Sequence, residues 1–244
     1  MTLFNCYQDA KRAEAYAKLE FKNTYHLAFR DLPRILKHHA LEGRALDFGC
    51  GTGRSTRFLK NLGFSSIGVD IAPEMIEIAR RLDPNEEYQL LADGELNSFP
   101  AESFELILSA FTFDNIPERA TKVRLMIELG RLLAKNGRLI NLVSSPELYV
   151  HDWASFTTRD FPENKQARSG DIVRCITTDF EDRRPCLDIL FTEESYREVY
   201  AEAGLEVVEM LKPLADGTEP YPWVNETKIA PWVIYNLRRV ERSR

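Results

Sequence analysis

The chain has 244 residues, of which 44% are hydrophobic and 29% charged, and its net charge is −6. This size and composition suit one folded domain with an added cap and a substantial buried core. The acidic balance argues against a nucleic-acid partner, because excess negative charge repels a phosphate backbone. The N-terminus lacks a signal-peptide core, and no segment approaches the roughly 18 apolar residues of a membrane helix. We therefore expect a soluble, cytoplasmic protein with no membrane partner.

The four cysteines do not form a metal-binding pattern. Cys6, Cys50, Cys175 and Cys186 include no C-x-x-C pair and no cluster with histidine, so we expect no metal cofactor. Cys175 and Cys186 are expected to face each other across a hairpin. We expect a structural thiol pair there, because nothing near them in the sequence is expected to lower the pKa of a thiol.

Two helical stretches come before the core. Residues 9–21 are rich in alanine, lysine and glutamate, which favours a helix. Residues 26–40 are the second stretch, and Pro33 within it predicts a bend or a restart. We expect residues 1–42 to form an N-terminal helical lid.

From residue 44 onward, short apolar runs alternate with helical patterns. The runs are expected to be strands at 45–48, 66–70, 88–91, 104–109 and 138–143. Between several of them, apolar residues three or four apart share one helix face. Strands that alternate with helices predict right-handed crossovers and a mostly parallel, doubly wound α/β sheet. We expect residues 43–144 to be a cofactor-binding core.

Residues 145–191 interrupt this alternation and are expected to form an insertion that caps the substrate. Within it, residues 172–178 and 186–191 predict a β-hairpin. Residues 192–244 are expected to complete the core, beginning with a helix that Gly204 ends. The last two strands are expected at 205–211 and 229–237.

The segment ALDFGCGTGRST, residues 45–56, joins the first strand to a helix through a glycine-rich turn, which is typical of a nucleotide site. Its glycines allow a ligand to approach the backbone closely. Arg54 stands where a dinucleotide fingerprint has its third glycine, and Asp47 adds a negative charge that disfavours phosphate. The turn therefore predicts a nucleotide ligand with a positive end.

At this point the sequence resembles the class I S-adenosylmethionine-dependent methyltransferases, in particular their quinone-biosynthesis and toxoflavin-type branch. The resemblance is carried in order by LDFGCGTGRS, by Asp70 at the end of SIGVD, by Asp93 in LLADGELNSFP and by LGRLLAKNGRLINLV. It implies a Rossmann-like, seven-stranded, mostly parallel sheet with an antiparallel last strand. It also implies S-adenosylmethionine as cofactor and S-adenosylhomocysteine as product.

The resemblance assigns Asp47 and the glycine turn to the methionine end of the cofactor, Asp70 to the ribose and Asp93 to the adenine. An N-terminal tyrosine and arginine close over the cofactor in several small-molecule methyltransferases, which suggests Tyr25 and Arg30 here. The alternative for Arg30 is a surface pair with Asp31. The expected cofactor-binding residues are Asp47, Gly49, Cys50, Gly51, Asp70, Ile71, Met75, Ala92, Asp93, Gly94, Ser109, Ala110, Tyr25 and Arg30.

The methyl acceptor is expected beyond the carboxyl ends of the strands, under the insertion. His151 is the candidate catalytic base because histidine titrates near neutrality, although a structural role is the alternative. Asp114 is a second candidate base. The expected substrate-binding residues are Phe111, Phe113, Tyr149, His151, Trp153 and Trp223, while Trp232 is expected to pack in the core.

Together these features predict a methyltransferase that acts on an oxygen or nitrogen of a small metabolite by in-line displacement. Two alternatives remain open. An NAD-dependent oxidoreductase also uses a glycine turn and an acid after the second strand, although Arg54 and Asp47 count against it. A non-catalytic module that binds S-adenosylmethionine would have the same motifs.

Overall fold

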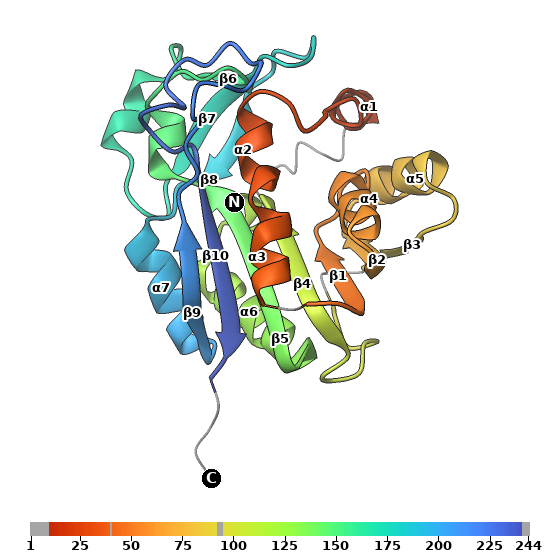
Figure 1. Cartoon of the computed structure of the whole chain (residues 1–244). Helices are drawn as coiled ribbons and strands as arrows, with labels where there is room; N and C mark the ends of the chain where they lie inside the picture. Colours follow the sequence, from red (N-terminus) through yellow and green to blue (C-terminus); the bar gives the residue numbers. More distant parts are fainter. Residues whose placement is uncertain (1–9, 40, 92–94, 241–244) are drawn as a thin grey trace.

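The computed structural model describes residues 10–39, 41–91 and 95–240. Its main body has three layers, a twisted central sheet with helices on both faces, and a smaller sheet lies beyond one end of the central one (Figure 1). Within the described residues, no helix has the length and apolar character needed to cross a bilayer.

The central sheet has seven strands in the order β3-β2-β1-β4-β5-β10-β9. The strands are β1 (Arg44–Phe48), β2 (Ser65–Asp70), β3 (Glu87–Leu90), β4 (Phe104–Ala110), β5 (Leu133–Ser144), β9 (Leu205–Leu211) and β10 (Trp232–Arg239). Neighbours from β3 to β5 pair in parallel, whereas β10 is antiparallel to both β5 and β9. The predicted seven-stranded sheet with an antiparallel last strand is therefore confirmed.

Strand alternation gives the sheet two apolar faces. One face packs against α6 (Arg119–Leu132) and α7 (Glu193–Glu202), and the other against α2 (Thr24–Arg30) and α3 (Leu32–His38). The strands between these layers read as continuous apolar runs because both of their faces are buried. The remaining helices are α1 (Ala10–Tyr16), α4 (Arg54–Asn61) and α5 (Pro73–Leu82).

α1 ends at Tyr16, five residues before the predicted end of the first helix, whereas the helices α3 and α7 follow the expected signals. Pro33 lies in the first turn of α3, so the second N-terminal stretch is two helices with Asp31 between them. The N-cap of α7 is Thr192, whose hydroxyl accepts a hydrogen bond from the Ser195 amide, and Gly204 follows its end with φ 71°.

The insertion forms the smaller sheet, with strands β6 (Phe156–Thr157), β7 (Ile172–Thr177) and β8 (Cys186–Ile189) in that order. β7 and β8 are antiparallel, and Cys175 lies directly opposite Cys186. This sheet sits beyond the end of the central sheet, beside α2 (Figure 1). The sequence pattern did not predict β6, which is only two residues long.

Candidate active site

The glycine turn between β1 and α4 is held tightly against β2. The amides of Gly49 and Cys50 both donate to the carbonyl of Val69, at 2.8 and 3.0 Å. Gly49, Gly51 and Gly53 have φ of 76°, 52° and 80°, values that glycine adopts readily and other residues avoid. Glycine is favoured at these three positions because the turn requires positive φ at each of them.

Asp70, at the end of β2, is joined to the glycine turn. Its Oδ2 accepts a hydrogen bond from the Gly51 amide at 2.8 Å, and its Oδ1 accepts one from the Ala72 amide at 2.9 Å. Burial raises the pKa of this carboxyl, and its amide partners oppose the rise. Each carboxylate oxygen has a further lone pair available for a ligand hydroxyl.

Asp47 points into the protein instead of toward the surface of the turn. Its side chain is 0% exposed, and its Oδ2 accepts hydrogen bonds from the hydroxyls of Ser55 and Thr56 at 2.7 and 2.6 Å. Burial raises its pKa to about 6, and Oδ1 has no hydrogen-bond partner among the described residues. Its contact with the methionine end of a cofactor stays a prediction, and its described role is to join the turn to α4.

The other predicted cofactor residues surround the same turn. Met75 lies beside Gly51, since a Cβ at residue 51 would be 4.0 Å from the methionine sulfur. Ile71 is 52% exposed at the mouth of the turn, whereas Cys50 and Ser109 are buried and Ala110 is half-buried. Asp93, predicted to contact the adenine, and the predicted cofactor-binding residues Ala92 and Gly94 lie outside the described residues.

Arg54 is a neighbour of the turn whose contacts the sequence did not predict. Its guanidinium carbon lies 4.8 to 5.8 Å from the centroids of four aromatic rings, and only 8% of the residue is exposed. The rings are those of Tyr16, Phe21, Tyr25 and Phe29. The N-terminal helices therefore contact the glycine turn through cation–π interactions.

A cavity of about 40 Å³ lies beside this turn. Tyr16 connects the two, because it lines the cavity and its Cε1 would be 3.6 Å from a Cβ at Gly51. Much of the wall is aromatic and packed around Trp232, whose ring centroid is 4.7 Å from that of Phe111. The lining residues are Tyr16, Tyr25, Phe111, Asp114, Asn115, Ser144, Leu148, Phe156, Cys175, Cys186, Asp188 and Trp232.

Two buried carboxyl groups belong to this wall. The Oδ2 of Asp114 accepts hydrogen bonds from the Ser144 amide and hydroxyl, at 2.9 and 2.8 Å. Burial raises the pKa of Asp114 to about 6, and the ammonium of buried Lys122 opposes that rise. Lys122 also donates to the carbonyl of Phe113. The Oδ2 of Asp188 accepts from the hydroxyl of Tyr149 at 3.0 Å.

The cysteine pair differs from the expectation of an inert pair of thiols. An Nη of Arg12 donates to the sulfur of Cys186 at 3.0 Å. Hydrogen bonding from Cys175 and the nearby Arg12 lower the pKa of Cys186 to about 6, while burial opposes the change. Spacing along the chain could not predict this contact, because Arg12 and Cys186 are 174 residues apart. No group of three or more His, Cys, Asp or Glu side chains suited to a metal occurs among the described residues.

The predicted substrate residues do not all reach the cavity. Phe111 lines it, and Tyr149 contacts it indirectly through Asp188. The prediction that Phe113 binds the substrate is wrong. Its side chain is 0% exposed in the core on the other face of the sheet, and its ring centroid lies 6.0 Å from that of Phe48. The left-handed backbone of Phe111, with φ 64°, separates the directions of the two rings.

His151, Trp153 and Trp223 are not among the residues that line the cavity. The Nε2 of His151 is 3.1 Å from a carboxylate oxygen of Glu147 near the surface, which fits the structural alternative. The indole of Trp153 donates to the carbonyl of Leu148 at 2.9 Å. Trp223 donates to Glu219 at 3.2 Å, whereas Trp232, expected only to pack, lines the cavity.

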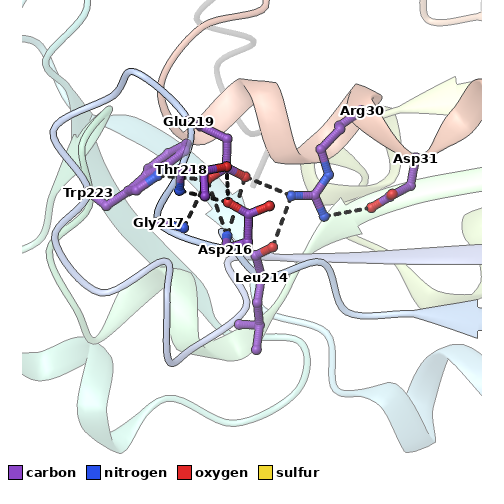
Figure 2. A network of polar contacts seen from close by, with 8 residues as sticks. All are labelled: Arg30, Asp31, Leu214, Asp216, Gly217, Thr218, Glu219 and Trp223. Carbon is purple, nitrogen blue, oxygen red and sulfur yellow. Dashed lines mark hydrogen bonds and ion pairs between the residues drawn. The ribbon is translucent and has the colours of Figure 1, made fainter.

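Arg30 makes contacts different from those predicted. Its guanidinium pairs with Asp31 at 3.0 Å and with Glu219 at 2.9 Å, and it donates to the carbonyl of Leu214 at 3.0 Å (Figure 2). The same Glu219 accepts hydrogen bonds from the amides of Asp216 and Gly217. Arg30 thus fastens α2 to the segment before β10, and the expected surface pair with Asp31 is present.

A larger cavity, of about 230 Å³, lies on the opposite face of β5 and β10. Phe191, Tyr196 and Tyr235 contribute its aromatic wall, and Lys212 lies at its edge in an ion pair with Glu193. None of the glycine-turn residues lines it, so the smaller cavity is the better candidate for the acceptor site.

Comparisons with known proteins agree with this geometry. A family model described as a methyltransferase domain matches residues 46–141. The chain is 32% identical over 122 residues to 2-methyl-6-phytyl-1,4-hydroquinone methyltransferase of Synechocystis, covering 49% of this chain and 35% of that one. It is 32% identical over 157 residues to protein MJ1123 of Methanocaldococcus jannaschii, covering 64% of this chain and 67% of that one.

Among solved structures, a S-adenosylmethionine-dependent methyltransferase from Clostridium acetobutylicum superposes with a TM-score of 0.66 at 15% identity. The superposition covers 97% of this chain and all of that one. At 15% identity it shows that the two proteins share a fold. The chain spans little more than a third of the Synechocystis enzyme and 39% of the demethylmenaquinone methyltransferase of Tropheryma whipplei. The strand order, the glycine turn and these relatives lead to one conclusion. The chain belongs to the class I S-adenosylmethionine-dependent methyltransferases.

Proposed function

We propose that the protein transfers the methyl group of S-adenosylmethionine to an oxygen or nitrogen of a small molecule. The observation that carries this proposal is the continuity between Gly51, the ring of Tyr16 and the small cavity. A donor at the turn and an acceptor in the cavity would be neighbours. Alignment of nucleophile, methyl group and sulfur contributes up to about 7–11 kcal/mol to such a displacement.

The described residues fit the cofactor. Asp70 has free lone pairs for the ribose hydroxyls, and the glycines leave the backbone of the turn open to the methionine part. Exposed Ile71 provides an apolar surface next to Asp70 for a base. When bound, S-adenosylmethionine supplies an electrophilic methyl group, and the protein contributes binding, alignment and exclusion of water.

The acceptor side is built by the insertion and the N-terminal helices, which we propose act as cap and lid around the core of residues 43–144. Cavity residues come from both parts, Tyr16 and Tyr25 from the helices and Cys186 and Asp188 from β8. Relatives named for quinone biosynthesis, such as the ubiquinone biosynthesis O-methyltransferase of Nitrosococcus oceani, favour a small-molecule acceptor. We propose no nucleic-acid, membrane or metal partner.

Calorimetric titration with S-adenosylhomocysteine tests the cofactor part of this proposal. We expect Asp70→Ala to weaken binding at least tenfold, because the ribose would lose its carboxylate partner. Glu77→Gln removes an exposed charge from α5 and is the matched control, for which binding should not change. Unchanged affinity in Asp70→Ala, or tight binding of NADH instead, would contradict the assignment.

Release of S-adenosylhomocysteine tests the catalytic part. The protein is incubated with S-adenosylmethionine and a panel of phenols, amines and carboxylates, and product formation is followed by mass spectrometry. Methylation of at least one acceptor separates an enzyme from a module that only binds the cofactor. Cofactor binding without any transfer would favour the non-catalytic alternative.

A further inference from the structure

The small cavity combines aromatic rings with acidic side chains. Tyr25, Phe111 and Phe156 all pack against Trp232, with ring centroids 4.7 to 5.9 Å from that of the indole. Asp114 and Asp188 contribute to the same cavity. Aromatic faces and carboxylates both attract an organic cation, and they do so more strongly when water is excluded.

Asp188 has one carboxylate oxygen available to a ligand. The residue is 8% exposed, and its Oδ2 accepts from Tyr149. No hydrogen bond to its Oδ1 occurs among the described residues, although the side chain lines the cavity. A carboxylate oxygen that lines a cavity can accept a hydrogen bond from a ligand, so a donor group in the cavity would be bound favourably.

The ionisable groups around the cavity also favour the binding of one positive group. Among the residues that the structure describes, three acidic groups are present, the carboxyls of Asp114 and Asp188 and the thiol of Cys186, against the two cations Lys122 and Arg12. Burial and the neighbouring Asp114 raise the pKa of Asp188 well above its usual value, as expected where positive charge is scarce. An anionic acceptor would meet two carboxyl groups and be disfavoured.

We propose that the acceptor presents a small amine head group to this cavity and that Asp188 binds the amine nitrogen. The inference rests on the proposed methyl transfer and specifies its substrate class. A cavity of about 40 Å³ accommodates a head group of a few atoms, and the rest of the acceptor extends past it. Cation–π contact with the rings and the free Oδ1 of Asp188 would select an amine over a carboxylate of the same length.

The chemistry balances with Asp188 as the proton acceptor. Binding of the ammonium favours the ionised form of Asp188, so the carboxyl releases its own proton to water. The ammonium then gives one proton to Oδ1, which frees the lone pair of the nitrogen and leaves Asp188 protonated again. That pair forms the new N–C bond to the methyl group while the S–C bond breaks and its electrons remain on sulfur. The products are a methylated ammonium ion and S-adenosylhomocysteine.

The test compares n-butylamine, butyrate and phenol as probes in saturation-transfer NMR titrations. Each probe is added to the protein alone and to the protein saturated with S-adenosylhomocysteine. We expect n-butylamine to bind at least tenfold more tightly than butyrate and more tightly than phenol. Asp188→Asn should weaken n-butylamine at least fivefold and leave phenol unchanged, because Tyr149 still has an oxygen partner in the variant.

Asp160→Asn, which removes an equal charge from an exposed loop, is the control and should leave all three affinities unchanged. S-adenosylhomocysteine affinity, measured separately, reports on the folding of each variant and on the proposed function. Absence of n-butylamine binding, equal binding of butyrate, tighter binding of phenol or an unaffected Asp188→Asn variant would each overturn the amine proposal. Loss of S-adenosylhomocysteine binding alone would instead overturn the proposed function, since the titrations of the free protein still test the cavity.

Discussion

The guanidinium carbon of Arg54 lies 4.8 Å from the ring centroid of Tyr25. This contact joins the first turn of α4 to α2, and an Nη of Arg54 also donates to the carbonyl of Glu20 at 3.3 Å. The N-terminal helices are thereby connected to the same turn that carries the predicted cofactor residues.

Arg54→Lys should therefore loosen the N-terminal helices. A compact ammonium cannot lie over several rings as a planar guanidinium does, and we expect the free energy of unfolding to fall by about 1–2 kcal/mol. Amide hydrogen exchange of residues 24–30 should become faster. Arg57→Lys, one turn later on α4, replaces a guanidinium that donates to the Thr52 carbonyl and is the control. Equal exchange rates in both variants would contradict the role of Arg54.

Gly53→Ala should damage the glycine turn more than Gly63→Ala. Both glycines have positive φ, 80° and 93°, so each alanine costs about 1–2 kcal/mol of backbone strain. A Cβ at residue 53 would also clash with the ring of Tyr88, whereas nothing lies within 4 Å of one at residue 63. Urea unfolding should show an additional loss of about 1–3 kcal/mol for Gly53→Ala. Equal losses would rule out the clash.

Asp47 should make the protein less stable as the pH rises from about 4 to about 6. Its folded-state pKa of about 6 lies above its ordinary value, so the native state binds the extra proton in this window. The stabilisation is complete below pH 4 and is lost above pH 6, by about 3 kcal/mol in free energy of unfolding.

Asp47→Asn should remove this part of the pH dependence, since an amide does not titrate. Its oxygen can still accept from Ser55 and Thr56. Urea unfolding at pH 4, 5, 6 and 7 measures the difference between the two proteins. A difference that stays constant across this range would mean that Asp47 does not titrate there.

Arg30→Ala should leave S-adenosylhomocysteine affinity within twofold of the original. Its partners are Asp31, Glu219 and Leu214, and none of them belongs to the glycine turn. Because the ion pairs are partly exposed, the free energy of unfolding should fall by about 1 kcal/mol or less. A tenfold loss of affinity in calorimetry would instead support the prediction that Arg30 closes over the cofactor.

The order of strands and helices was predictable because each buried strand is an apolar run between turn residues. The last strand of the core, β10, begins at Trp232, three residues later than expected, since the preceding residues form a loop. Short elements such as β6 give no periodic signal, because two residues cannot establish a period.

The candidate site was less predictable than the fold. The glycine turn and Asp70 are local features, and the sequence alone identified them. Arg30 and Asp188 depend on partners far along the chain, Glu219 for one and Tyr149 for the other. The opposite directions of Phe111 and Phe113 depend on the backbone of a single residue, which spacing does not reveal.

The cavity draws Asp188 from the inserted sheet, while the glycine turn and Asp70 belong to the central one. Under the functions proposed above, donor and acceptor recognition are therefore encoded in separate pieces of chain. Mutations in the hairpin can change which compounds are methylated without altering the residues that bind the methyl donor. A chimera that exchanges the β7–β8 hairpin between homologues is thus a direct route to altered specificity.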